Sequence, residues 1–232
     1  SIQQVAISAW ALQPDPWLPG KTALVIGGTT GDDSLVVNPG GGRANFKLIL
    51  NGVSQVVPAP TGRIIVHGQA GNDQIQVVGG IKVPTLLDGG DGADVIQGGN
   101  GPNIILGGAG DDVLTGGNDR DLLIGGLGAD RLDGQAGDDV LIGGTTAYDL
   151  DDAALCVIMD EWLDAGILAD RVSHLTVGGG RNLNILLNET TVWADGDVNT
   201  VNGGSGRDLV IFGPLDVIDG VEAAFPVKKK KP

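Results

Sequence analysis

The sequence has little of what usually holds a small domain together. It contains one cysteine, Cys156, so it can form no internal disulfide. Aromatic residues make up only 3% of the chain, which argues against a conventional core of bulky rings. Basic residues number 14 against 29 acidic ones, and the net charge of −15 argues against a nucleic-acid partner. No apolar stretch approaches the length of a membrane-spanning helix.

Residue types that often carry catalysis are also scarce. The two histidines, His67 and His174, lie in unrelated sequence contexts. No nucleophile elbow, zinc-protease motif or phosphate loop is present. Cys156 lies in an apolar helical stretch, where a buried thiol is expected rather than a nucleophile. We therefore expect no enzyme active site in these residues.

Glycine, in contrast, accounts for 41 of 232 residues, and much of it falls into one repeat. From Gly89 to Ile142 the chain reads GGDGADVIQ, GGNGPNIIL, GGAGDDVLT, GGNDRDLLI, GGLGADRLD, GQAGDDVLI, with no slip in register. The sixth position is acidic in five copies and Asn in one, and the eighth is always aliphatic. A flexible linker would have no fixed apolar position. The pattern is that of the calcium-binding nonapeptide that forms parallel β-helices.

Each position of the repeat has a physical role. Glycine reaches backbone angles that allow a sharp turn, and such a turn directs several carbonyl oxygens to one point. The sixth-position carboxylate adds a charged oxygen, and a cluster of oxygens suits Ca²⁺. The last three residues form a short strand whose middle side chain points inward. Two repeats make one coil, so alternate repeats line opposite edges of a stack.

These repeats resemble the RTX, or haemolysin-type, calcium-binding β-roll family. The resemblance implies a fold dominated by β-structure, a right-handed parallel β-roll or β-solenoid, with several Ca²⁺ ions bound between adjacent turns. The implied ligands are the sixth-position side chains and the turn carbonyls: Asp94, Asn103, Asp112, Asp121, Asp130 and Asp139, with Gly90, Gly92, Gly108, Gly110, Gly126 and Gly128. The site at Asn103 is expected to be weak or lost, because Asn103 is neutral and Pro102 precedes it.

Partial copies lie outside this block. GTTGDDSLV at Gly28–Val36, GQAGNDQIQ at Gly68–Gln76 and GGSGRDLVI at Gly203–Ile211 add Asp33, Asp73 and Asp208 as candidate ligands. Ala194–Asn202 is a poor copy in register with the last of these. Before the block, Val77–Gly79 shifts the frame by three residues.

The N-terminal part reads as β-structure. Ser1–Leu12 is expected to be a strand, and Gln13–Gly20, with three prolines, an extended rigid connector. The strand belongs either to the local sheet or to another module, to which it would be donated. Asn51-Gly52 between two apolar runs predicts a hairpin.

After Ile142 the repeat stops. Asp149–Ala165 has helical apolar spacing and predicts an amphipathic helix, with a second short one through Leu168–Leu175. Its carboxylates Asp160, Glu161 and Asp164 are expected on a solvated face. Strands are expected at Asn184–Leu187 and Thr190–Trp193. The tail KKKKP is expected to be a short solvated segment.

We therefore divide the chain into five parts: 1–20, strand and connector; 21–88, a β-rich cap with degenerate repeats; 89–145, the core β-roll; 146–180, a helical insertion after the repeats; and 181–232, C-terminal strands with one further repeat and the lysine tail. The segments KTALVIGGTTGDDSLVV, PTGRIIVHGQAGNDQIQV and AALCVIMDEW also resemble the C-terminal calcium-binding region of very large secreted bacterial surface proteins.

Two classes of function follow. The first is a calcium-binding structural or adhesive module, secreted or at the cell surface, whose roll folds on Ca²⁺ and which could self-associate into a filament by strand addition. The alternative is the accessory or secretion domain of an RTX enzyme or toxin. The expected partner in both is calcium, with no nucleic acid and no membrane span.

Overall fold

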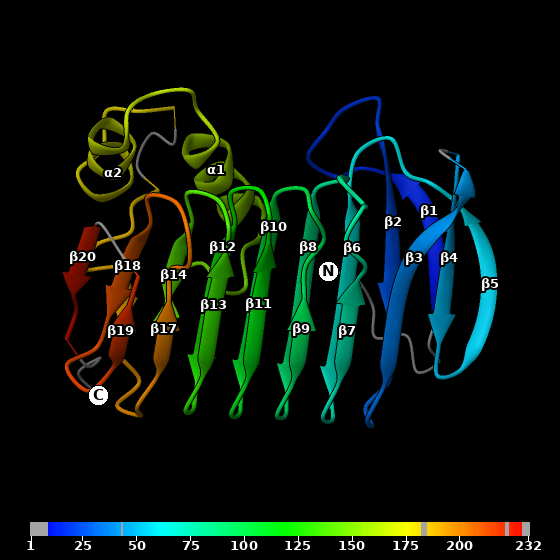
Figure 1. Ribbon diagram of the computed structural model, residues 1–232, viewed down its shortest axis with the longest axis horizontal. Coiled ribbons are helices and arrows are strands. Elements are labelled where there is room, and N and C mark those ends of the chain that lie inside the picture. The colour runs from blue at the N-terminus through cyan, green and yellow to red at the C-terminus, as the bar shows by residue number, and fades with distance from the viewer. Residues whose placement is uncertain (1–8, 43, 182–184, 221–222, 229–232) are drawn as a thin grey trace.

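The computed structural model describes residues 9–42, 44–181, 185–220 and 223–228. Its strands lie side by side along the long axis of the molecule, in two facing sheets, with both helices over the C-terminal half (Figure 1). The strands of the first sheet are, in spatial order, β1 (Ala9–Pro14), β2 (Thr22–Gly27), β6 (Ile64–Ala70), β8 (Thr85–Asp91), β10 (Asn103–Ala109), β12 (Leu122–Leu127), β14 (Val140–Ile142), β18 (Leu209–Phe212) and β20 (Ala223–Pro226). Those of the second are β19 (Val217–Asp219), β17 (Thr200–Asn202), β13 (Arg131–Gln135), β11 (Val113–Gly117), β9 (Val95–Gln97), β7 (Gln74–Val77), β3 (Ser34–Gly42), β4 (Asn45–Leu50) and β5 (Val53–Pro58).

The nine-residue period produces this arrangement directly. Successive repeats alternate between the sheets, so each strand pairs in parallel with the strand two repeats later. The eighth-position side chain points between the sheets: Ile96, Leu114 and Leu132 from one, Ile105, Leu123 and Leu141 from the other, all fully buried. Each coil thus buries one aliphatic layer, as a solenoid requires. The predicted parallel β-roll is confirmed.

The first sheet is also buried on its outer face. Its repeats carry apolar residues at the seventh and ninth positions, such as Leu122 and Ile124, which form a second core with the helices. Helix α1 (Asp152–Trp162) contributes Leu155, Ile158 and Trp162, all fully buried. The corresponding positions of the second sheet are mostly exposed, so the helices cover one face of the roll only.

Both helices were expected from the apolar spacing. The side chain of Asp151 caps α1 by accepting the N–H of Ala154 at 3.1 Å, and α2 (Leu168–Thr176) follows. The expected strand at Asn184–Leu187 is wrong in its described part, because residues 185–187 have no strand pairing. The next one is shorter than expected: β16 (Val192–Trp193) pairs antiparallel with β15 (Thr145–Thr146), after a turn in which Thr191 and Val192 donate to the carbonyl of Asn188.

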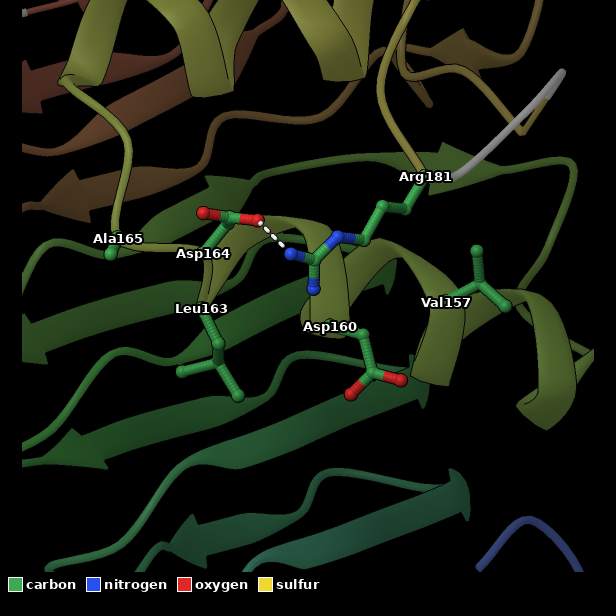
Figure 2. A pocket seen from close by; sticks show the side chains of 6 residues that line it. All are labelled: Val157, Asp160, Leu163, Asp164, Ala165 and Arg181. Carbon is green, nitrogen blue, oxygen red and sulfur yellow. Dashed lines mark ion pairs between the residues drawn. The ribbon is translucent and has the colours of Figure 1, made fainter.

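The acidic residues of α1 do not all face water. Glu161 is buried, where it accepts the N–H of Arg181 and lies 2.6 Å from Nδ1 of His174. Asp160 and Asp164 do lie toward the outer side, around a shallow depression in which Arg181 pairs with Asp164 at 3.0 Å (Figure 2). The expectation of a wholly solvated acidic face is therefore wrong for Glu161.

The N-terminal segment folds against the roll. β1 pairs antiparallel with β2, so the described part of the expected Ser1–Leu12 strand extends its own sheet, while residues 1–8 lie outside the described residues. The prediction of an extended connector holds for Gln13 and Pro14, which belong to β1, and is wrong from Asp15 onward. Asp15 accepts the N–H groups of Trp17 and Leu18 at 3.0 Å each, and its carboxylate pairs with Arg63 at 3.1 Å. These bonds fold the chain back into β2.

The hairpin and the tail complete the description. β4 and β5 pair antiparallel across Asn51 and Gly52, which both have positive φ, so the hairpin is confirmed. The tail is outside the described residues from position 229 onward. No helix in the described part is long and apolar enough to cross a membrane.

Candidate metal sites

The sixth-position side chains form two ladders, one along each edge of the roll. In each ladder, Oδ1 accepts the backbone N–H of the sixth residue one coil earlier, at 2.7–3.0 Å for most rungs. The first ladder runs Asp33, Asp73, Asp94, Asp112, Asp130, Asn199 and Asp216. The second runs Asn103, Asp121, Asp139 and Asp208. The structure therefore brings all nine sixth-position candidates into ladders, and adds Asn199 and Asp216.

In several rungs the second carboxylate oxygen has no hydrogen-bond partner among the described residues. The Oδ2 atoms of Asp73, Asp94, Asp112, Asp130 and Asp139 are buried and have no hydrogen-bond partner among the described residues. A buried, unpaired carboxylate oxygen is costly unless something positive meets it.

A carbonyl oxygen converges on the same point as each of these atoms. A methyl group placed on Gly107 would collide with both Oδ2 of Asp112 and the carbonyl oxygen of Gly125, one coil further on. The same holds at Gly89, for Asp94 and the Gly107 carbonyl, and at Gly134, for Asp139 and the Gly203 carbonyl. Two acceptors directed at one space, with room for no side chain, form a cradle for a cation.

The donor set fits calcium. No three His, Cys, Asp or Glu side chains of the described residues gather at one point, so each candidate site combines at most two carboxylates with backbone carbonyls. Such all-oxygen sites with few charged ligands suit a hard cation. The oxygens would supply direct coordination when Ca²⁺ binds, and their anionic charge would be neutralised there.

Burial shifts the acid–base behaviour of these carboxyls. Burial, opposed by the N–H bond and reinforced by neighbouring carboxylates, raises the pKa of Asp112 to about 7 and that of Asp130 to about 8. On the other edge it raises the pKa of Asp139 to about 9. The pKa values of Asp73 and Asp94, also raised chiefly by burial, are each about 6. The charged ladder is therefore unfavourable without a cation.

At one rung, a side-chain amide pairs the oxygens that a metal would otherwise meet. The Nδ2 of Asn103 donates to the carbonyl oxygens of Gly99 and Gly101, at 3.2 and 2.8 Å, and to Oδ1 of Asp121 at 2.7 Å. Oδ2 of Asp121 accepts the N–H of Gly117 at 2.6 Å. The amide group thus occupies the place of the cation, which is the physical reason for the expected weak site at Asn103. Asp121 has no unpaired oxygen for the interval toward Asn103.

At each end of the first ladder, hydrogen bonds similarly pair both carboxylate oxygens of the last Asp. At the C-terminal end, Nδ2 of Asn199 donates to Oδ1 of Asp216 at 3.1 Å, and Gly213 N–H donates to Oδ2 of Asp216 at 2.6 Å. At the N-terminal end, both oxygens of Asp33 accept bonds, from Asn51 and from Thr29. The geometry thus places the cation candidates between these ends, from Asp73 to Asp130.

The candidate glycines explain how closely the turns stack. Gly90 and Gly92 have φ of 102° and 133°, and a methyl group on either would collide with a carbonyl of the preceding coil. The same applies to Gly108, Gly110, Gly126 and Gly128. The sequence analysis does not predict a role for the first-position glycines Gly89, Gly107 and Gly125, although they lie directly beside the carboxylates. Their place at the head of each GG pair was the available signal.

Alanine substitutions at the two kinds of rung are expected to have different effects. Asp112→Ala removes an unpaired oxygen and is expected to weaken or remove a calcium ion. Asn103→Ala is expected to leave the number of bound ions unchanged but to lower thermal stability, because it leaves buried acceptors unpaired at a cost of about 1–3 kcal/mol. Isothermal titration calorimetry and thermal unfolding in saturating calcium separate the two. Equal titration curves for the two variants would contradict this ranking.

The raised pKa values give a pH dependence in chelator. Groups whose folded pKa exceeds the unfolded value near 4 favour the folded state at low pH, and this contribution is lost as pH rises through about 6 to 9. The β-sheet circular dichroism signal in chelator is therefore expected to grow as the pH falls from about 8 to about 5.5. A signal that stayed flat or fell would show that carboxylate repulsion is not what opposes folding.

Comparison with known families agrees with this geometry. The model of the RTX calcium-binding nonapeptide repeat, in four copies, matches residues 88–123, 115–145 and 191–211. No curated protein and no solved structure matched. Such repeats are typical of secreted bacterial proteins. The chain therefore contains RTX calcium-binding nonapeptide repeats, and these repeats carry the rungs of the two ladders from Asp94 to Asp139 and on to Asp208.

Proposed function

We propose that this chain is a non-enzymatic structural or adhesive module, working outside the cell, whose roll is held together by calcium. The observation that supports this most is the row of buried Oδ2 atoms from Asp73 to Asp130, each directed at a carbonyl of the next coil. A row of such sites along the core axis serves the fold itself and not a single reaction centre.

Calcium then has the role that disulfides have in many secreted domains. Cys156 is buried against Arg63, with Nη1 of Arg63 2.7 Å from Sγ, and burial raises the pKa of the thiol to about 11. Extracellular calcium modules commonly bind with dissociation constants of about 10⁻⁴ to 10⁻³ M, near the ion's concentration outside cells. The module would therefore fold after export.

The histidines support a non-enzymatic role. His67 on β6 lies 3.2 Å from Asp88 on β8, whereas His174 on α2 lies 2.6 Å from Glu161 on α1. Each side chain contacts a carboxylate on a neighbouring element of the fold. Both pairs can be understood as packing contacts of the sheet and of the helices.

Self-association into a filament is the second part of the proposal. β5 is the last strand of its sheet, and Val53 and Val56 on it are 65% and 66% exposed. An exposed apolar edge strand can pair with a strand of another chain. Strand addition at this edge would extend the stack.

Calcium titration followed by circular dichroism and light scattering tests both parts together. Growth of β-signal with calcium is expected to precede any growth of scattering. Val56→Lys is expected to keep calcium-dependent folding and to lose assembly. The matched variant is Val217→Lys, which changes an exposed valine on β19, at the other end of the same sheet. A chain that binds no calcium would refute the module, and a monomer at all calcium concentrations would refute only the filament.

A further inference from the structure

One repeat of the first ladder is divided in two by the helical insertion. Asp130 donates its N–H to Oδ1 of Asn199 at 2.8 Å, although the two are 69 residues apart, where ordinary rungs are 18 apart. The first two positions of this repeat are Gly143 and Gly144: a methyl group on Gly143 would lie 2.9 Å from Nδ2 of Asn199. Gly126 N–H also reaches the carbonyl of Gly144 at 3.3 Å, and the two residues are 18 apart, the ordinary interval of one coil. The helices therefore lie inside a single turn.

The divided turn lacks a carbonyl that intact turns provide. The fourth-position N–H of Gly92 donates to the carbonyl of Ala109 at 2.7 Å, and that of Gly110 to Leu127 at 2.7 Å. The equivalent carbonyl for Gly128 would belong to the next turn, but there the chain has already entered the helical insertion. Its N–H instead donates to Oδ2 of Asp195, at 2.9 Å. A carboxylate has replaced a peptide carbonyl.

The Asp195 carboxylate bonds to the turn that also holds a buried carboxylate oxygen without a partner in the described part of the chain. Asp130 is 2% exposed and its Oδ2 has no partner among the described residues. A methyl group on Gly125 would collide with that oxygen and lie 2.6 Å from the carbonyl oxygen of Gly143. A methyl group on Gly144, the residue after Gly143, would lie 3.1 Å from Cα of Ala194, the residue before Asp195, and the Gly128 amide that Asp195 accepts lies two residues before Asp130. A second carboxylate beside an unpaired buried one is unfavourable unless a cation lies with them.

We propose that Asp195 is an additional ligand of a calcium site formed by the Asp130 carboxylate and the Gly143 carbonyl. This rests on the calcium binding proposed above and goes beyond it, because Gly143 and Gly144 supply the first two positions of the divided repeat, and Asp195 stands where the contiguous pattern of Ala194–Asn202 has glycine. Gly143 precedes the insertion and Asp195 follows it. The ion therefore joins the two ends of the helical insertion, and its binding orders α1 and α2 on the sheet.

Asp195→Asn tests the ligand. The amide keeps an oxygen for the Gly128 N–H but removes the charge. Native mass spectrometry is expected to count one calcium fewer, or calorimetry to show one site weakened about tenfold. Amide exchange across residues 147–193 is expected to quicken at limiting calcium. Asp197→Asn, two residues away and exposed, is the matched control and is expected to behave as the parent.

Asp195→Glu guards against a purely structural effect. It restores the charge and is expected to recover the lost ion. Should Asp195→Asn bind as many ions, as tightly, as Asp197→Asn, or should Asp195→Glu lose the ion equally, the assignment of Asp195 is overturned while the calcium-binding module stands. A parent chain that binds no calcium would overturn both.

Discussion

In excess chelator at neutral pH, Gly89–Ile142 is expected to lose its β-structure, and to regain it cooperatively in millimolar calcium. Backbone ordering costs about 1–2 kcal/mol per residue, and against it each coil offers one small aliphatic layer between the sheets, with a second layer only on the outer face of the first sheet. The buried carboxyls add to the cost, since their pKa values of about 6 to 9 mean that the charged form is disfavoured in the fold. Calcium removes that cost and bonds the turn carbonyls, so binding energy becomes folding energy.

Hydrogen exchange by mass spectrometry is the measurement for this switch. Amides of the block are expected to exchange within the shortest labelling time in chelator, and to be protected with calcium. Magnesium at the same concentration is expected to substitute poorly, because it prefers tight octahedral geometry and retains its waters. Full protection of the block in chelator would refute the mechanism, even if calcium still bound.

The period of the sequence predicted the roll well because each position has a local physical reason. The eighth-position residues, such as Ile105 and Leu123, are fully buried as expected. The seventh and ninth positions held a further signal. They are apolar in the repeats of the first sheet and mostly polar in those of the second, as Ile104 and Arg131 illustrate, which indicates the face that the helices cover.

Other features depend on contacts that a linear pattern does not contain. The sequence pattern predicts one poor repeat at Ala194–Asn202, whereas in the structure Gly143 and Gly144 supply its beginning. A repeat divided by an insertion has no contiguous signature. The prolines of Gln13–Gly20 predicted an extended connector, but Asp15 bonds the next turn and pairs with Arg63, which is distant in sequence. Tertiary contacts decided that segment.

Gly107→Ala is expected to have a large effect for a single methyl group. The added carbon would occupy the space beside Oδ2 of Asp112 and the Gly125 carbonyl. Both the carboxylate and the next coil would have to move. We expect the loss of at least one calcium ion and a fall in unfolding free energy of about 1–3 kcal/mol, the usual cost of overpacking.

Gly166→Ala is the matched control, because its nearest described atoms would lie 3.9 and 4.0 Å from the new methyl group, an ordinary contact distance. Native mass spectrometry gives the ion count, and denaturant unfolding in saturating calcium gives the stability. If Gly107→Ala bound the parental number of ions, the space beside Gly107 would not be a cation cradle, and the ladder would need another explanation.

The insertion leaves and re-enters the roll through the two-residue ribbon of β15 and β16. Thr145 faces Trp193 and Thr146 faces Val192, so the ends of the inserted segment are held one strand spacing apart, like the stem of a hairpin. Closing a longer loop on such a stem costs little, about 0.6 kcal/mol for each doubling of its length. The turn is therefore a natural graft point, at which a roll can acquire or exchange a domain without a change of register. What limits the choice is the outer face of the first sheet: any replacement for α1 and α2 has to bring an apolar surface for Leu122, Ile124 and their neighbours.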